Sequence, residues 1–162
     1  MRKILAPMAI MASLSGCMMP PGPAERLTYA AHDMNAATRF GRLDVAMDHV
    51  AGHAREDFAK RHASWGRKIR VLDVELRGMR MITPETAEVQ VAISWHDTSH
   101  MTIQVSYLAQ KWTRKENDWA LVEELRVGGA KGLFAPTDDP FSTSDPAPLD
   151  PGSMSNGTFG QL

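Results

Sequence analysis

The spacing of apolar residues changes from helical to strand-like near residue 66, and this change limits the chain to one class of fold. Apolar residues recur at intervals of three and four from 24 to 38 and again from 43, with a stripe that continues to about Trp65. This spacing places them on one face of a helix. After residue 67 apolar and polar residues alternate, which is typical of antiparallel strands with one buried face. The alternating segments lie at 72–76, 87–95 and 101–107 and begin again at Trp119. Helices followed by a meander of strands predict an α+β fold, in which N-terminal helices pack on a curved four-stranded antiparallel sheet.

The N-terminus has the order of a secretory signal. Two basic residues precede the apolar run 4–12, and the small residues Ser15 and Gly16 precede Cys17. A basic start, a short apolar run and small residues before a cleavage site define such a signal. The run is too short for a membrane-spanning helix, which needs ~20 apolar residues. We therefore predict a signal peptide at 1–16.

The segment Leu14-Ser15-Gly16-Cys17 resembles the lipobox of bacterial lipoproteins. The resemblance implies cleavage between Gly16 and Cys17, attachment of diacylglycerol to the Cys17 sulfur, and acylation of the new amine. Cys17 is the only cysteine, so it has no disulfide partner within the chain. Several acyl chains on one residue give a lasting anchor, whereas a single chain binds a membrane reversibly. The alternative is an ordinary signal peptide followed by a chance cysteine.

The lipobox predicts a protein of the bacterial cell envelope. Met18 stands where lipoproteins of the inner membrane often carry Asp, which favours the outer membrane, with the chain facing the periplasm. We expect a proline-rich spacer at 17–23, an α+β domain at 24–131 and a disordered tail at 132–162. The tail contains four Asp and no Lys or Arg, and it has too few apolar residues to offset the entropy of ordering. The net charge of −1 and the lack of a basic stripe predict no binding to nucleic acid.

Three segments make the chain resemble the nuclear-transport-factor-2-like family. They are the helix-turn-helix around Phe40-Gly41-Arg42-Leu43-Asp44, the long hairpin from Val89 to Tyr107, and the charged turn between Trp112 and Trp119. The resemblance covers residues 25–127 and implies a cone of curved sheet closed by the N-terminal helices. That family contains isomerases, dehydratases, polyketide cyclases and members without known catalysis, so it implies a fold more than a function. If the turn occupies 114–117, Trp112 and Trp119 face each other across the two strands and stabilise the sheet by roughly 0.2–1 kcal/mol.

Catalytic members of that family use a Tyr on the first helix with acidic or His residues, and Tyr29, His32 and Asp33 match these residue types. A general acid or base must reach its proton within the pocket. At ~100° per residue, Tyr29 and His32 lie far around the helix from Leu27 and Met34. We therefore expect a solvated helix face at these residues, and no catalytic site.

Two histidine pairs have spacings that suit a metal ion. His49 and His53 lie four residues apart, with Glu56 and Asp57 as further oxygen ligands, and His96 and His100 bracket a turn. Imidazoles at such a spacing can share a metal ion, and a histidine pair can also respond to pH near neutrality. The first pair falls off the apolar stripe and the second lies at a polar hairpin tip. We expect exposed polar residues in both places, and we predict no cofactor or metal site.

Basic residues concentrate at 55–70, which holds six Lys and Arg against two acidic residues. Such a segment could rest on anionic lipid headgroups near the tether, or it could be a solvated helix end. The acidic tail could also fold back on it.

These features predict a membrane-anchored envelope lipoprotein that is not an enzyme. We expect its cone-shaped domain to bind a protein partner or a small apolar ligand. The first alternative is an enzyme of the isomerase, dehydratase or cyclase type that uses polar residues inside the cone. The second alternative is a structural accessory that forms a homodimer through its sheet.

Overall fold

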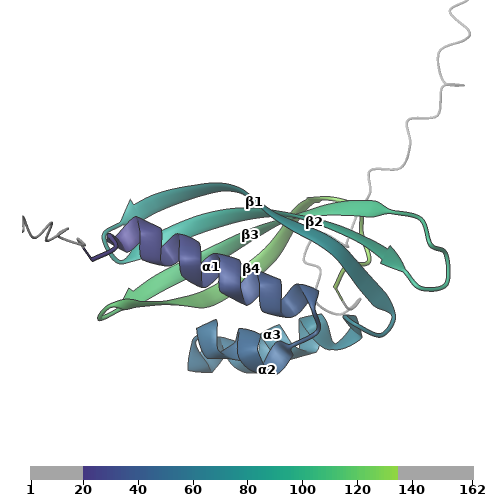
Figure 1. Ribbon diagram of the computed structural model, residues 1–162, viewed down its shortest axis with the longest axis horizontal. Helices are drawn as coiled ribbons and strands as arrows, with labels where there is room; N and C mark the ends of the chain where they lie inside the picture. The colour runs from purple at the N-terminus through teal and green to yellow at the C-terminus, as the bar shows by residue number, and fades with distance from the viewer. Residues whose placement is uncertain (1–19, 135–162) are drawn as a thin grey trace, which may run out of the picture.

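The computed structural model describes residues 20–134, in which helices cover one face of a four-stranded antiparallel sheet (Figure 1). This arrangement confirms the α+β fold and the layering predicted from the periodicity. The predictions for the signal peptide, for Gly16 and Cys17, and for nearly all of the expected tail lie outside the described residues. Between residues 20 and 134, no helix is both long and apolar enough to cross a membrane.

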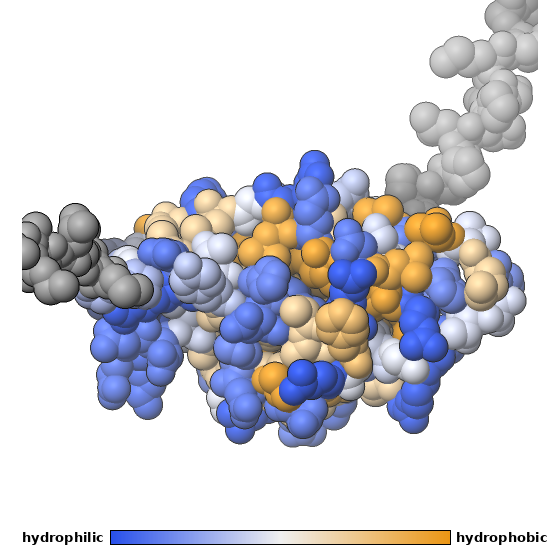
Figure 2. Space-filling model, in the orientation of Figure 1, coloured by the Kyte–Doolittle hydropathy of each residue, from blue (hydrophilic) through white to orange (hydrophobic). Residues whose placement is uncertain are grey.

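The first helix, α1 (Pro23–Arg39), packs its apolar face on the sheet. Pro23 occupies the first turn, where the missing N–H breaks no hydrogen bond and the fixed φ suits a helix. The fully buried side chains follow the predicted spacing and are Leu27, Ala31 and Met34. After the helix, Gly41 takes a φ of +71°, a left-handed conformation that favours glycine. On the surface that bears α1, hydrophobic and hydrophilic residues are intermixed (Figure 2).

The segment after α1 is broken into short pieces, whereas the sequence predicted a longer helical stripe. Its elements are α2 (Leu43–Ala46), α3 (Arg55–Arg61) and the single 3₁₀ turns η1 (Met47–His49), η2 (Gly52–Ala54) and η3 (His62–Ser64). The main break lies at Val50 and Ala51. There the Ala51 N–H donates to the carbonyl oxygen of Leu121 at 2.9 Å, so the backbone bonds to the edge of the sheet. Gly52 follows this break directly and begins η2.

The sheet contains β1 (Ile69–Thr83), β2 (Thr86–Asp97), β3 (Gln104–Lys115) and β4 (Asp118–Gly129), paired in sequence order. On β2 every second residue from Ala87 to Trp95 is buried, which confirms the predicted alternation. The register of β1 shifts between Leu76 and Gly78, as at a β-bulge. Such bulges bend a strand and increase its twist, which lets the sheet curve around α1.

The hairpin between β3 and β4 is tighter than the sequence predicted. Its turn has two residues, with Glu116 at a φ of +59°. Trp112 consequently lies opposite Leu121, and the predicted pairing of Trp112 with Trp119 is wrong. The Trp119 indole N–H instead donates to the carbonyl oxygen of Pro23 at 2.9 Å, which ties the start of α1 to the sheet.

The last described residues return to the core. Gly129 has a φ of +74°, and a Cβ at this position would lie 2.3 Å from the carbonyl oxygen of Val105. Only glycine can therefore pass β3 at this distance. Leu133 and Phe134 are then 0% and 6% exposed, so the folded domain extends through Phe134. The sequence predicted that both residues belong to the tail, because two adjacent apolar residues beside a glycine show neither helical nor strand periodicity.

Candidate functional site

Four buried polar side chains form a chain of contacts between the helices and the sheet. They are Asn35 on α1, His62 on η3, Gln110 on β3 and Glu124 on β4, and none is more than 5% exposed. The Gln110 amide donates to Asn35 Oδ1 at 2.9 Å and to Glu124 Oε1 at 2.8 Å. His62 Nε2 lies 3.2 Å from Glu124 Oε2. These contacts thus cross the core from the helices to the sheet.

The sheet register explains why these side chains meet. Gln110 and Glu124 are directly opposite each other on β3 and β4, and both point inward. Asn35 adjoins the apolar face of α1, and its amide also donates to the carbonyl oxygen of Ala31 at 2.7 Å. Buried amides and carboxylates require such partners, because an unpaired polar group in an apolar core costs several kcal/mol.

Both ring nitrogens of His62 face oxygen acceptors. Nδ1 lies 2.8 Å from the carbonyl oxygen of Phe58, and a carbonyl can only accept, so Nδ1 carries a proton. Nε2 lies close to Glu124 Oε2 without meeting the geometry of a hydrogen bond. The two side chains are therefore close polar partners within the core.

The surroundings of Glu124 favour its carboxylate form. Burial alone would raise the pKa of Glu124, but the charge and polar contact of His62, the hydrogen bond from Gln110 and the charge of Arg61 together lower it. Glu124 is therefore a carboxylate that faces the His62 ring. The rings of Phe58, Trp65 and Phe134 surround the ring of His62, with centroid distances of 4.0, 4.3 and 5.5 Å.

A cavity of about 330 Å³ opens beside this ion pair. Glu124 and Arg61 belong to its wall, with His53 and Asp57 farther out, whereas His62 does not line it. Arg61 also donates to the backbone carbonyl of Glu124. The wall therefore presents a guanidinium group beside a carboxylate whose oxygens already face His62 and Gln110. Such a wall can bind a polar group, but its carboxylate is not free.

A second cavity, of about 650 Å³, has a mainly apolar wall. It shares His53 and Val122 with the first cavity, and Ile82 and Trp112 contribute apolar surface. The Trp112 indole N–H is buried without a hydrogen-bond partner. The charged residues of this wall are paired, Lys111 with Glu123 and Glu88 with Arg80, so that mainly their aliphatic stems remain for contact.

The helix-face residues considered from the sequence lie apart from both cavities. Tyr29 is 56% exposed, and its hydroxyl donates to Glu25 Oε1 at 2.9 Å. His32 and Asp33 are also exposed and lie 3.6 Å apart. This is the solvated helix face that the sequence predicted.

The two histidine pairs are not brought together for metal binding. His49 and His53 lie on separate 3₁₀ turns, so the regular helical spacing assumed for them is absent. His96 Nδ1 contacts the carbonyl oxygen of Asp97, and His100 contacts Ser99. Within residues 20–134, no group of three His, Cys, Asp or Glu side chains could hold a metal ion.

The sequence did not identify His62 and Glu124 as partners. His62 continues the apolar stripe through Phe58 and Trp65, and a histidine in such a stripe signals a buried polar contact. The sequence does not identify Glu124 as an inward-facing residue. The register shift between β3 and β4 changes the phase of alternation just before Glu123 and Glu124, so the alternating pattern does not show which of these two side chains points inward.

The site and fold define an α+β domain with a buried acid–base pair and two adjoining cavities. No protein-family model and no curated protein matches the chain. Among solved structures, the chain is similar to the solution structure of a SEC-C motif containing protein from Rhodopseudomonas palustris. The TM-score is 0.52 at 14% sequence identity, over 61% of this chain and 77% of that chain. This likeness concerns the fold alone.

The comparison corrects the family expected from the sequence. The solved neighbour is described by a SEC-C motif, and the assignment to the nuclear-transport-factor-2-like family is wrong. The helix-turn-helix at 40–44, the hairpin from Val89 to Tyr107 and the turn at 112–119 follow from packing helices on a strand meander, so they do not identify a family. No comparison bears on the lipobox, which stays a prediction.

Proposed function

We propose that this protein is an envelope lipoprotein, anchored through Cys17 at the outer membrane, whose domain binds a small apolar ligand without transforming it. The observation that supports this most is the apolar cavity of about 650 Å³ beside Trp112. Ligand cavities usually measure about 300–1,000 Å³ and combine apolar walls with a few polar groups. Here His53 and Val122 lead from the apolar cavity to the polar one, so an apolar ligand with one polar end suits the pair.

The state of the buried ion pair favours binding over catalysis. A general base needs a free lone pair within reach of the substrate. Glu124 faces His62 and accepts a hydrogen bond from Gln110, and its pKa is lowered by these partners despite its burial. A weak base, with one oxygen bonded to Gln110 and the other facing the His62 ring, is poorly suited to remove a proton.

Quenching of tryptophan fluorescence by a brominated fatty acid tests the binding site. The mature chain with Cys17→Ser serves for this assay, because it carries no lipid and needs no detergent. Bromine quenches only at short range, so we expect saturable quenching that Trp112→Phe largely removes. That substitution breaks no hydrogen bond, since the indole N–H has no partner. Trp95→Phe is the control at a residue outside this cavity.

A second pair of variants tests the cavity wall itself. Ile82→Glu places a charge on the wall at a residue that is 53% exposed, and Ile103→Glu places one elsewhere at a residue that is 65% exposed. We expect the first to weaken fatty acid binding at least about tenfold, which corresponds to about 1.4 kcal/mol, and the second to leave it unchanged. Equal binding by both variants would exclude this cavity as the site.

An enzyme is the second candidate function, because Glu124 and Arg61 share the wall of the polar cavity. A substrate that displaced Gln110 from Glu124 could expose a base beside a cation. This candidate requires turnover of an isomerase or dehydratase substrate that disappears in Glu124→Gln while the fold is retained. Binding of fatty acid without turnover, unaffected by Glu124→Gln, supports the binding function.

A further inference from the structure

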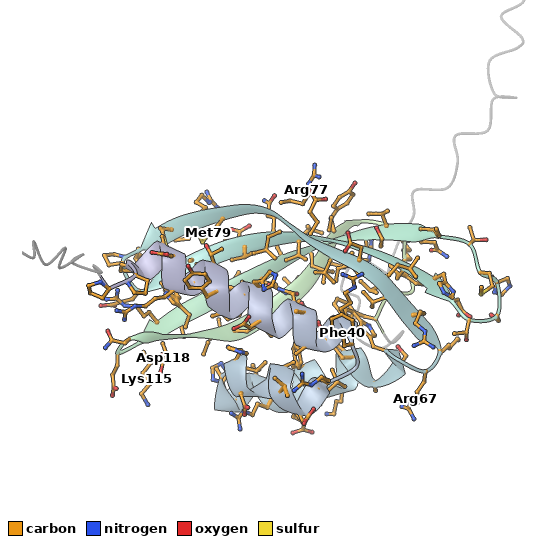
Figure 3. All side chains as sticks on the ribbon, in the orientation of Figure 1. Phe40, Arg67, Arg77, Met79, Lys115 and Asp118 are labelled. Carbon is orange, nitrogen blue, oxygen red and sulfur yellow. The ribbon has the colours of Figure 1, made fainter. Side chains whose placement is uncertain are left out.

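A basic groove of about 740 Å³ lies where α1 ends, away from both cavities described above. Two turns meet there, one at Gly41 after α1 and one at Gly66 before β1. A Cβ on Gly66 would lie 3.9 Å from the Cα of Gly41, so the turns nearly touch. Figure 3 shows Phe40 and Arg67 near this end of the molecule. Phe40 is 72% exposed although it is a large apolar residue.

The groove has three arginines on its wall and no acidic residue. These are Arg39, Arg67 and Arg70. Arg39 is partly neutralised by Asp73, with Nη1 and Oδ1 3.1 Å apart. Arg67 donates to the carbonyl oxygen of Ala63, and neither it nor Arg70 has an acidic partner among the described residues. Cations gathered on one wall raise the local potential and favour an anionic occupant.

We propose that the acidic segment following Phe134 docks in this groove of its own chain. Phe134 is the last described residue, and its ring stacks on Trp65 with centroids 6.2 Å apart. Trp65 itself lines the groove. Asp138 and Asp139 follow Phe134 by four and five residues. At ~3.3–3.6 Å per residue, they can reach ~13–18 Å from Phe134.

Charge complementarity supports this occupant. Residues 135–162 carry four Asp and no Lys or Arg, and the charged residues of the groove wall are all arginines. Exposed ion pairs are individually weak, at about 0–1 kcal/mol. A short tether compensates, because it holds the segment at an effective concentration of about millimolar. Phe141 follows the two aspartates and provides an apolar side chain for the exposed ring of Phe40.

Zero-length crosslinking of the mature full chain tests the docking. Arg67→Lys keeps the charge and supplies an amine that a carbodiimide can join to a neighbouring carboxylate. We expect crosslinks from position 67 to Asp138 or Asp139, found by mass spectrometry and reduced by high salt. Arg77→Lys, at an exposed arginine that pairs with Glu75 on the same strand, is the matched control and should give no crosslink to the tail.

Two further measurements separate the occupants. In a mixture of ¹⁴N and ¹⁵N chains, crosslinks within one chain support the proposal, whereas crosslinks only between chains assign the groove to a second copy and overturn it.

Asp138→Asn with Asp139→Asn should speed hydrogen exchange at 66–71, and Asp145→Asn with Asp150→Asn should change it less. If the first pair changes nothing while vesicles of phosphatidylglycerol and phosphatidylcholine slow that exchange, the occupant is a lipid headgroup and the proposal fails. Absence of any crosslink from position 67 to the tail also overturns it.

Discussion

Replacing His62 by phenylalanine should destabilise the protein far more than replacing Glu124 by glutamine, although both substitutions remove the same ion pair. A phenyl ring suits the aromatic surroundings of His62, and the carbonyl oxygen of Phe58 keeps the hydrogen bond from the backbone N–H of residue 62. The Glu124 carboxylate, however, is left buried without the His62 ring and keeps only the hydrogen bond from Gln110 and the charge of Arg61. Glu124→Gln is gentler, because the new amide can donate to the His62 ring while its oxygen still accepts from Gln110.

The size of the effect follows from the protonation of Glu124. A buried carboxylate without a partner takes up a proton instead of remaining charged. The ordinary pKa of glutamate is 4.5, and holding the group protonated at neutral pH costs about 1.4 kcal/mol per pH unit, or about 3.4 kcal/mol in total. This agrees with the loss of about 3–5 kcal/mol expected when one partner of a buried ion pair is removed. For Glu124→Gln we expect a loss of about 1 kcal/mol or less, since every hydrogen bond has a replacement.

The pH dependence provides the sharper test, because it has opposite signs in the two proteins. The folded-state pKa of Glu124 is lowered in the wild type, so its contribution is fully present above 4.5 and is lost as the pH falls through the lower folded-state value. In His62→Phe the pKa of Glu124 is raised, so the deficit is largest at neutral pH and shrinks as the pH falls toward 4.5. Urea unfolding of the mature Cys17→Ser chain at several pH values measures both. Equal losses for the two variants at neutral pH, or a deficit of His62→Phe that does not shrink in acid, would refute the assignment of charges.

Three further outcomes are expected. Gly129→Ala should lose at least about 1–3 kcal/mol of stability from its left-handed conformation, with a further loss from the close approach to β3, whereas Gly78→Ala, with open space around its Cβ position, should change the unfolding midpoint little. Phe134→Ala should cost about 3–5 kcal/mol as a buried aromatic truncation, and Val127→Ala, at a residue 53% exposed, much less. Cys17→Ser should abolish incorporation of labelled palmitate and move the protein from the membrane to the soluble fraction, and persistence of both label and membrane association would contradict lipidation.

The sequence predicts what is local in this fold and misses what depends on distant pairing. The period of three and four located α1, and the period of two located β2, because each reports only which side of one element is buried. The register between elements is different. A two-residue turn with Glu116 in the left-handed region moved Trp112 away from Trp119, and no pattern in either strand specifies that turn. The burial of Phe134 likewise depends on a tryptophan that lies far away in the sequence.

The candidate site has two parts, and we expect each to have a different role. The His62–Glu124 pair joins η3 to β4 across the core, so its loss should lower stability. The apolar cavity is bounded partly by exposed residues such as Ile82, so its alteration should lower ligand affinity with little effect on folding. If Ile82→Glu abolishes fatty acid binding at unchanged stability while Glu124→Gln leaves affinity intact, the ion pair serves the architecture and the cavity serves the function. If affinity instead follows the protonation of Glu124, the two belong to one site, and the carboxylate beside Arg61 recognises the polar end of the ligand.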